Sequence, residues 1–143
     1  MKVENIMTKN IVSLQAEDTV EHAANLMKEH GVGALPVCND DKVTGIITDR
    51  DIALRSIATG ENIQNQSIKN IMTSNPVTVS PNINATEAAE IMSKKQIRRL
   101  PVVEDKNIVG MVSLGDISTE SNLENSAGKA LAGISETNLS EFD

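Results

Sequence analysis

The order of hydrophobic and polar residues predicts short strands and amphipathic helices that alternate along the chain. Two segments carry apolar residues at positions i, i+3, i+4 and i+7, the spacing of one helix face; they are Val20, Ala23, Ala24 and Met27, and Ala85, Ala88, Ala89 and Met92. Short apolar runs predict strands at residues 11–14, 34–38 and 43–48, and again at 77–79, 100–103 and 108–113. A further helix is predicted to begin near Asp49 and another near Leu114. The pattern is β-α-β-β-α, present twice, and indicates a mixed α/β fold.

Polar residues mark the ends of these elements. Thr19 and Asn84 are the predicted N-caps of the two amphipathic helices, because short polar side chains accept hydrogen bonds from the first helical N–H groups. Gly31 is the predicted end of the first helix, and Gln96 occupies the same place in the second. Polar stretches between the last two strands of each set predict hairpins.

The two sets of elements are copies of one unit. Residues 5–8, Asn-Ile-Met-Thr, recur as residues 70–73, and the same offset of 65 positions (70 − 5) aligns the helices and the strands. No gap is needed between residues 5–52 and 70–117, and 16 of these 48 positions are identical. Chance does not hold one register over such a length, so the chain is a tandem repeat.

The repeat predicts the domain organisation. We expect the first repeat at residues 1–58, a polar linker at 59–68, the second repeat at 69–120, and a C-terminal helix with a frayed tail at 121–143. Each repeat alone leaves an apolar sheet surface bare, so the two repeats are expected to pack together about a pseudo-two-fold axis. Such an axis generates two similar clefts, and we therefore expect two related ligand sites.

The C-terminal segment lies outside the repeat. Its apolar residues form a weak helical stripe, made of Leu123, Ala127, Ala130, Leu131 and Ile134. Two interpretations stay open: the helix packs on its own repeat, or it forms a dimer contact. Residues after Ser135 are expected to be frayed.

Composition and charge narrow the function. With 39% hydrophobic and 23% charged residues among 143, the chain is expected to be a globular protein. Its net charge of −7 argues against a nucleic-acid partner, which requires a basic surface, although a local group of donors can still hold phosphate. The apolar runs are too short for a membrane span, and residues 1–5 lack the apolar stretch of a signal peptide. With a single cysteine, the cytoplasm is the default compartment that we expect. A single cysteine, Cys38, excludes an internal disulfide, and without Trp or Tyr a planar ligand would lie against aliphatic side chains.

One motif closes each repeat and carries the candidate chemistry. A strand ends at a hydroxyl residue, Thr48 or Ser113, and an acid follows three residues later, Asp51 or Asp116. This is the pattern of a capping box, in which hydroxyl and carboxylate satisfy the free amides of a helix start. The same groups suit a nucleotide, since a carboxylate can accept two hydrogen bonds from a ribose diol and a helix start favours phosphate. The two interpretations are compatible, and both stay open.

Basic residues are unevenly spread. Arg98 and Arg99 precede the first hairpin strand of the second repeat, where the first repeat has Gly-Ala. Either they form a solvated helix end, or one of them faces a cleft and binds phosphate through its planar guanidinium. Arg50, inside the helix-start motif, is the better phosphate candidate of the first repeat, and Arg55 is interpreted as a surface residue.

The doubled pattern resembles a pair of CBS domains, the cystathionine-β-synthase-type regulatory repeat that is also called a Bateman module. The resemblance rests on Ile-Met-Thr at residues 6–8 and 71–73, the Ala-Ala-x-x-Met helices, Leu-Pro-Val at 35–37 and 100–102, and the closing segments 45–52 and 110–117. It covers about residues 1–120, and the whole chain is similar to small stand-alone bacterial proteins of this type. Each motif alone is weak, but their doubled, gapless order is specific.

The resemblance implies two clefts that bind adenosine-containing ligands: AMP, ADP, ATP or S-adenosylmethionine. Carried over by motif, the implied contacts are ribose with Asp51 and Asp116, ribose or phosphate with Thr48 and Ser113, phosphate with Arg98 or Arg99, and the base with Ile46, Met111, Val12 and Val77. No cofactor is expected to be required, although Mg²⁺ could accompany ATP, and a homodimer is expected. The repeats depart from the family pattern at different places, residues 33–34 and 114–115, so the two sites are expected to differ in affinity.

These observations favour a non-catalytic regulatory module whose output lies in an unidentified effector protein, with no nucleic-acid or membrane partner. A ligand-free dimeric scaffold is the alternative, in which the motifs act only as caps. An enzyme such as a nucleotide hydrolase is disfavoured, because His22 and His30 are interpreted as exposed helix residues and Cys38 as a small buried thiol. The glycines of residues 31–33 lead into a strand rather than away from one, so they are not a dinucleotide fingerprint.

Overall fold

The computed structural model describes residues 1–136 and consists of two compact units. The first-repeat unit contains Asn10–Val77 together with Val103–Ile108. The second-repeat unit contains Met1–Lys9, Thr78–Val102 and the described residues from Val109 onward. Each unit therefore holds the amphipathic helix and the closing motif of one repeat but the opening Ile-Met-Thr segment of the other.

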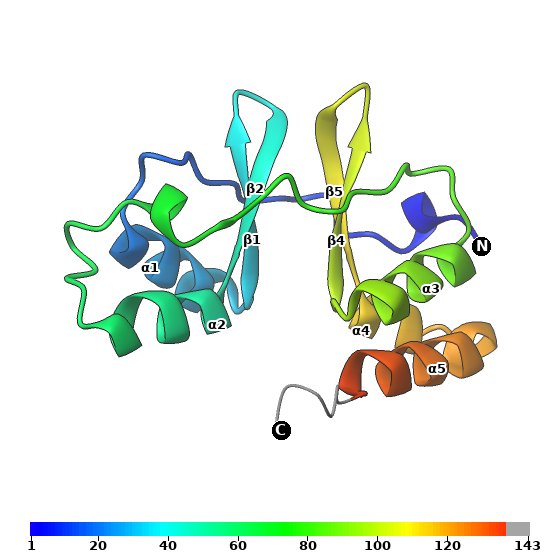
Figure 1. Ribbon diagram of the computed structural model, residues 1–143. Coiled ribbons are helices and arrows are strands. Elements are labelled where there is room, and N and C mark those ends of the chain that lie inside the picture. Colours follow the sequence, from blue (N-terminus) through cyan, green and yellow to red (C-terminus); the bar gives the residue numbers. More distant parts are fainter. Residues whose placement is uncertain (137–143) are drawn as a thin grey trace. The chain divides into compact units, whose positions relative to one another are not determined.

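Both units contain the helices and hairpin strands that the sequence predicts (Figure 1). The first-repeat unit has α1 (Val20–His30), β1 (Ala34–Asn39), β2 (Lys42–Thr48), α2 (Asp49–Asp51) and the short strand β3 (Thr73–Ser74). α2 continues into a π-helical turn, Ile52–Ser56, and a 3₁₀ turn, Ile57–Thr59. The second-repeat unit is built on α3 (Ala85–Lys95), α4 (Leu114–Ser118), α5 (Glu124–Ser135) and most of β4 (Arg99–Glu104) and β5 (Asn107–Ser113). The turn end of this hairpin, Val103–Ile108, belongs to the first-repeat unit. Three further 3₁₀ turns are Val3–Asn5, Ile68–Asn70 and Ser121–Leu123.

The ends of the amphipathic helices follow the polar signals in the sequence. Thr19 accepts a hydrogen bond from the N–H of His22 at 3.1 Å and so caps α1. Gly31 ends α1 in the left-handed conformation, at φ 65°, and Gln96 ends α3 in the same conformation at φ 56°. Asn84 precedes α3 as predicted, but among the described residues its side chain makes no cap hydrogen bond.

The first strand of each repeat is shorter than the sequence predicts. In the first-repeat unit only Leu14 pairs with β1: its N–H donates to Pro36 O at 3.0 Å, and its carbonyl accepts from the N–H of Cys38 at 2.7 Å. The next bond of a parallel ladder would require an N–H at Pro36, which proline lacks. Val79 pairs with Val102 in the same way beside Pro101, so each predicted strand is reduced to a single bridge.

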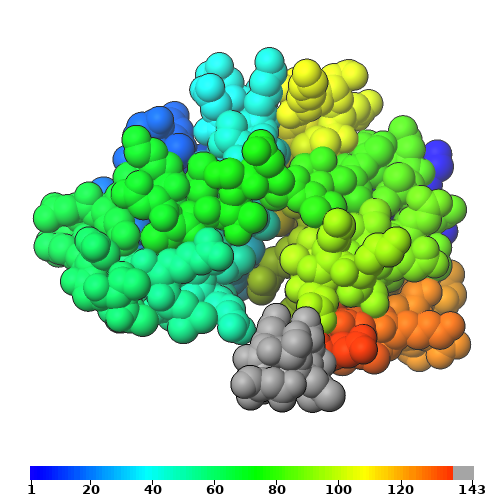
Figure 2. Space-filling view, in the orientation of Figure 1, coloured from blue at the N-terminus to red at the C-terminus, as the bar shows by residue number. Residues whose placement is uncertain are grey.

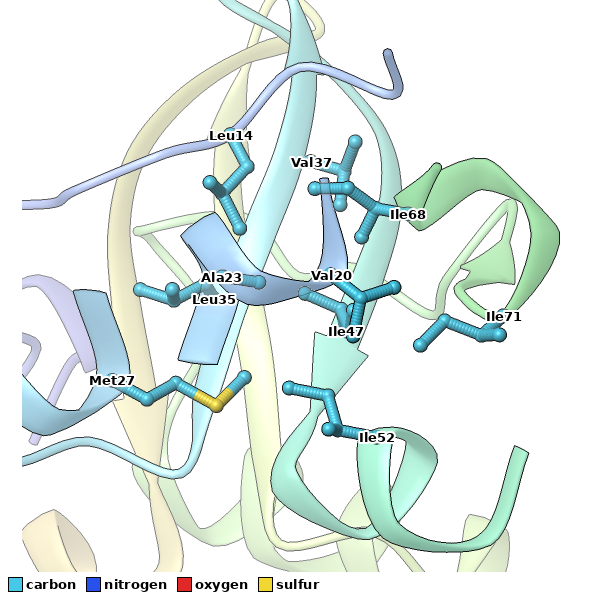
Figure 3. Packing of buried hydrophobic residues seen from close by; sticks show 10 residues of the cluster. All are labelled: Leu14, Val20, Ala23, Met27, Leu35, Val37, Ile47, Ile52, Ile68 and Ile71. Atoms are coloured by element: carbon cyan, nitrogen blue, oxygen red, sulfur yellow. The ribbon is translucent and has the colours of Figure 1, made fainter. Parts of the chain in front are cut away.

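The core of the first-repeat unit joins one face of α1 to the hairpin (Figure 3). α1 contributes Val20, Ala23 and Met27, as its helical spacing predicts. The other buried members of this cluster are Leu14, Leu35, Val37, Ile47, Ile52, Ile68 and Ile71. Each fully buried side chain of this size contributes about 1.5–3 kcal/mol. Since Ile47 and Ile52 flank the end of β2, this packing fixes the position of the closing motif.

The exchanged opening segments pack closely against glycines. β3 pairs with β2, with Thr73 opposite Ile46, and a Cβ on Gly45 would lie 2.7 Å from Met72 Sδ and 3.0 Å from Thr73 O. In the second-repeat unit a Cβ on Gly110 would lie 2.5 Å from the sulfur at position 7 and 3.0 Å from the carbonyl oxygen at position 8. Glycine is required at both places because the chain's own opening segment occupies the space that a side chain would need.

The C-terminal helix α5 packs on α3 and α4 within the second-repeat unit (Figure 1). The apolar stripe of the C-terminal segment buries Leu123, in the turn before α5, and Ala127 and Ala130 on α5, whereas Leu131 stays 47% exposed. Gln96 Nε2 donates to Gly133 O at 3.3 Å and to the carbonyl oxygen at position 136 at 2.8 Å, which fastens the end of α5. Packing on its own repeat is therefore confirmed, and a dimer contact stays a prediction. Fraying is predicted after Ser135: Glu136 is extended, with φ −62° and ψ 128°, and residues 137–143 lie outside the described residues.

Candidate functional site

Each unit holds one complete capping box where its second hairpin strand meets the following helix. In the first-repeat unit the N–H of Thr48 donates to Asp51 Oδ2 at 2.9 Å, and the N–H of Asp51 donates to Thr48 Oγ1 at 3.1 Å. In the second-repeat unit the N–H of Ser113 donates to Asp116 Oδ2 at 2.9 Å, and the N–H of Asp116 donates to Ser113 Oγ at 3.0 Å. The capping interpretation is thus confirmed in both repeats, with nearly the same geometry.

A second backbone contact ties each helix start to the residue that precedes the hairpin. The N–H of Leu114 donates to Arg98 O at 2.8 Å, and in the other unit the N–H of Asp49 donates to Gly33 O at 2.9 Å. The backbone of the Arg98–Arg99 pair therefore lies next to the start of α4, in the same unit as Asp116. The Arg98 side chain is exposed and that of Arg99, the first residue of β4, is half-buried.

The capping boxes leave hydrogen-bonding capacity on both carboxylates. An ionised carboxylate has about four lone-pair sites, and the box uses one of them, on Oδ2. Asp51 and Asp116 are half-buried, so part of each carboxylate still faces solvent. Each can accept two further hydrogen bonds, for example from a vicinal diol, without losing its cap. Capping and ligand binding therefore do not compete for the same lone pair.

The two carboxylates have different neighbours. Arg55 Nε lies 3.8 Å from Asp51 Oδ1, and Arg55 NH1 donates to Ile71 O at 3.2 Å. Among the described residues, no lysine or arginine of the second-repeat unit lies at ion-pair distance from Asp116. Arg55 is exposed, as interpreted from the sequence, but its contact with Asp51 was not foreseen. The signal for it is the i, i+4 spacing on one helix face.

The other predicted binding residues are exposed or half-buried and belong to both units. Arg50 is exposed, and its backbone N–H donates to Asp49 Oδ1 at 2.8 Å. Ile46 and Met111, on β2 and β5, are half-buried next to the exchanged opening segments. Val12 is half-buried and packs against the core of the first-repeat unit. Val77 also belongs to the first-repeat unit, whereas Met111 belongs to the second-repeat unit.

The residues that the sequence analysis disfavours as catalytic groups lie where a structural or surface role suits them. Burial raises the pKa of the Cys38 thiol, which is 4% exposed, and so disfavours the reactive thiolate. His22 and His30 are exposed on α1, as predicted. Within residues 1–136, no three His, Cys, Asp or Glu side chains gather in a way that could hold a metal ion. No helix in this part of the chain has the length and apolarity to cross a membrane.

A groove lies between α3 and α5 of the second-repeat unit, with a volume of about 270 Å³. Figure 2 shows the two helices side by side, α3 in yellow-green and α5 in orange and red. The groove is lined by Thr86, Ala89, Glu90, Ser93, Lys94, Ser126, Lys129 and Ala130. None of the predicted binding residues belongs to this lining, and ligand pockets are usually somewhat larger, about 300–1,000 Å³. The candidate site therefore remains the closing motif rather than this groove.

Comparison with known proteins identifies the repeat. The family model of the CBS domain matches residues 3–57 and 68–122. The chain is similar to the CBS domain-containing protein YhcV of Bacillus subtilis, with 40% identity over 137 residues that cover 96% of this chain and 97% of that protein. It is also similar in structure to the CBS domain protein TA0289 of unknown function from Thermoplasma acidophilum, with a TM-score of 0.83, 27% identity and coverage of 93% and 75%.

A further similar structure is a complex with two ligands. It is the CBS domain pair of protein MJ0100 in complex with 5-methylthioadenosine and S-adenosyl-L-methionine, with a TM-score of 0.76, 32% identity and coverage of 82% of this chain and 93% of that one. The two matched segments contain the two copies found in the sequence, residues 5–52 and 70–117. The chain therefore belongs to the CBS domain family and carries two CBS domains in tandem.

Proposed function

We propose that the protein is a non-catalytic regulatory module that binds adenosine-containing ligands through the closing motifs of its two repeats. The observation that carries the proposal is the duplicated half-buried carboxylate, held by a capping box and left with free acceptor capacity. A ribose diol presents two adjacent O–H donors, which match such an acceptor. The similar structure with 5-methylthioadenosine and S-adenosyl-L-methionine supports an adenosine ligand.

Arginines are proposed to bind the phosphate or carboxylate group of the ligand. Arg98 and Arg99 lie next to the start of α4, and a guanidinium is well suited to a phosphate or carboxylate group on the ligand. Strand alternation sends these two side chains to opposite faces, so one of them serves the ligand. In the first repeat Arg50 has this role. AMP, ADP and ATP are the preferred ligands on this basis, with Mg²⁺ as a companion of ATP, and S-adenosylmethionine is the next candidate.

Binding would act by changing the arrangement of the repeats or of two protomers. A ligand shifts such an equilibrium only as far as its affinities for the two states differ. The proposal includes a cytoplasmic location, a homodimer, and a separate effector protein that responds to the change. Neither nucleic acid nor a membrane is a partner in this proposal.

The test is isothermal titration calorimetry of the full chain with adenosine, AMP, ATP and S-adenosylmethionine. Asp116→Asn retains an oxygen that can cap the Ser113 amide but replaces the second acceptor with an amide donor. A hydrogen bond to a charged group contributes about 1.5–3 kcal/mol, so losing it should raise the Kd at that site roughly 10- to 100-fold. Asp40→Asn, the same change in an exposed turn, is the matched control and should bind normally.

A ligand-free scaffold is the competing function, and one observation favours it. Among residues 1–136, every buried side-chain oxygen and nitrogen already has a hydrogen-bond partner, so the fold is complete without a ligand. A binding module should gain about 2.7 kcal/mol of stability at a ligand concentration 100 times Kd. No thermal shift with any of the four ligands at millimolar concentration would favour the scaffold. Hydrolysis of ATP by the purified protein would favour an enzyme over both.

A further inference from the structure

The two repeats differ at the residue four positions after the binding carboxylate. Arg55 follows Asp51, and Glu120 follows Asp116, so the charge at equivalent places is opposite. The capping boxes themselves agree within 0.1 Å in both hydrogen bonds, since the distances are 2.9 and 3.1 Å in one unit and 2.9 and 3.0 Å in the other. The geometry of the capping box therefore does not distinguish the two carboxylates, whereas the charge of the residue four positions later does.

Arg55 is held beside Asp51 by a second contact. Its NH1 donates to the carbonyl oxygen of Ile71, a residue of the buried core, at 3.2 Å. This bond restrains the guanidinium, so that Nε lies 3.8 Å from Asp51 Oδ1, the oxygen that the capping box leaves free. The Asp51 side chain is 13% exposed and that of Arg55 is 57% exposed, so solvent screens the attraction only in part.

Among the described residues of the second-repeat unit, the same oxygen of Asp116 has no such neighbour. Within the described part of the second-repeat unit no cation lies at ion-pair distance from it, and the residue at the position of Arg55 is an acid. An O–H donor that approaches Asp116 meets the full negative charge of the carboxylate. An O–H donor that approaches Asp51 meets a carboxylate whose charge is partly neutralised by the Arg55 guanidinium.

We infer that Arg55 determines the affinity of the first-repeat site: its guanidinium competes with the ribose hydroxyls for Asp51 and makes this site weaker than the one at Asp116. The inference rests on the proposed function, because it concerns the same two carboxylates. Its consequence is sequential filling, with one ligand per chain at low concentration and a second at higher concentration. Exposed ion pairs contribute about 0.2–1 kcal/mol, which corresponds to a roughly 1.4- to 5-fold difference in Kd.

The experiment measures the first-repeat site in isolation, in the full chain with Asp116→Asn. Adenosine is the probe, because it carries the ribose diol but no charge that could interact with an arginine. Adding Arg55→Gln should tighten adenosine binding about threefold. Lys28→Gln, which removes a positive charge from an exposed position of α1 in the same unit, is the control and should leave the Kd unchanged.

A parallel titration with AMP distinguishes the other role that Arg55 could have. If Arg55 binds phosphate, Arg55→Gln weakens AMP and leaves adenosine unchanged, and the inference is overturned. An unchanged or weaker Kd for adenosine in Arg55→Gln also overturns it. Both results leave the proposed function intact, provided that the parent protein binds adenosine or AMP. A parent that binds neither sinks the proposed function itself, and the inference with it.

Discussion

Substitution of Gly45 by alanine should destabilise the protein through a contact that no local sequence rule describes. The new methyl group would lie 2.7 Å from Met72 Sδ and 3.0 Å from Thr73 O. The methionine sulfur can move, but Met72 packs against the core, and Thr73 is held by its pairing with Ile46. The backbone of β3 must therefore yield, and overpacking of this kind costs about 1–3 kcal/mol.

Urea denaturation is the assay, with circular dichroism as the signal. A loss of about 2 kcal/mol, with a slope of about 2 kcal/mol per molar urea, lowers the midpoint by about 1 M. The matched control is Gly128→Ala, in the middle of α5, where an added Cβ meets no atom within 4 Å. That change should stabilise the protein by about 0.5–1 kcal/mol, because alanine loses less entropy in a helix than glycine. A midpoint for Gly45→Ala at or above that of the parent would refute the reasoning.

Three further predictions concern single residues. Gln96→Ala should lower the free energy of unfolding by about 1 kcal/mol, because it removes two hydrogen bonds to the end of α5 and keeps a side chain at φ 56°. Gln96→Gly loses the same bonds but relieves the backbone, so its stability should lie closer to that of the parent. Equal losses of stability in urea for the two variants would contradict this. Ser113→Ala should cost about 1 kcal/mol by removing the acceptor for the Asp116 amide, and Ser113→Thr, which copies Thr48, should be nearly neutral in the same assay. Burial raises the pKa of the Cys38 thiol above its ordinary value, so the unfolded state loses its proton first as the pH rises. The free energy of unfolding should therefore be constant well below the ordinary thiol pKa of about 8.5 and fall as the pH rises through it. Cys38→Ala should lack this part of the decline, and identical slopes from pH 7 to 10 would exclude a contribution from the thiol.

Local features of the fold could be predicted from the sequence because they depend on near neighbours. The helical stripe of α1, the stop at Gly31 and the Thr48–Asp51 capping box each involve residues within a few positions of one another. The repeat strengthens every such prediction, since the same pattern occurs a second time. The family follows from the same motifs in their doubled order.

What the sequence analysis missed depends on contacts between distant residues. The first strands are short because Pro36 and Pro101 have no N–H to donate to residues more than twenty positions away along the chain. The Arg55–Ile71 bond and the close approach of Met72 to Gly45 are contacts of the same long-range kind. Periodicity reports which face of an element is apolar, but not which segment covers it.

The exchange of opening segments has a consequence for the origin of the chain. In this chain Thr73 pairs with Ile46, and Thr8 pairs with Met111, each across the two repeats. A single ancestral repeat would lack this pairing and could form it only by exchanging opening segments with a second copy. Fusion of two copies turns that encounter into an intramolecular event, at an effective concentration in the millimolar range. Once fused, the halves can diverge in charge, as Arg55 and Glu120 have, while each still receives its opening segment from the other.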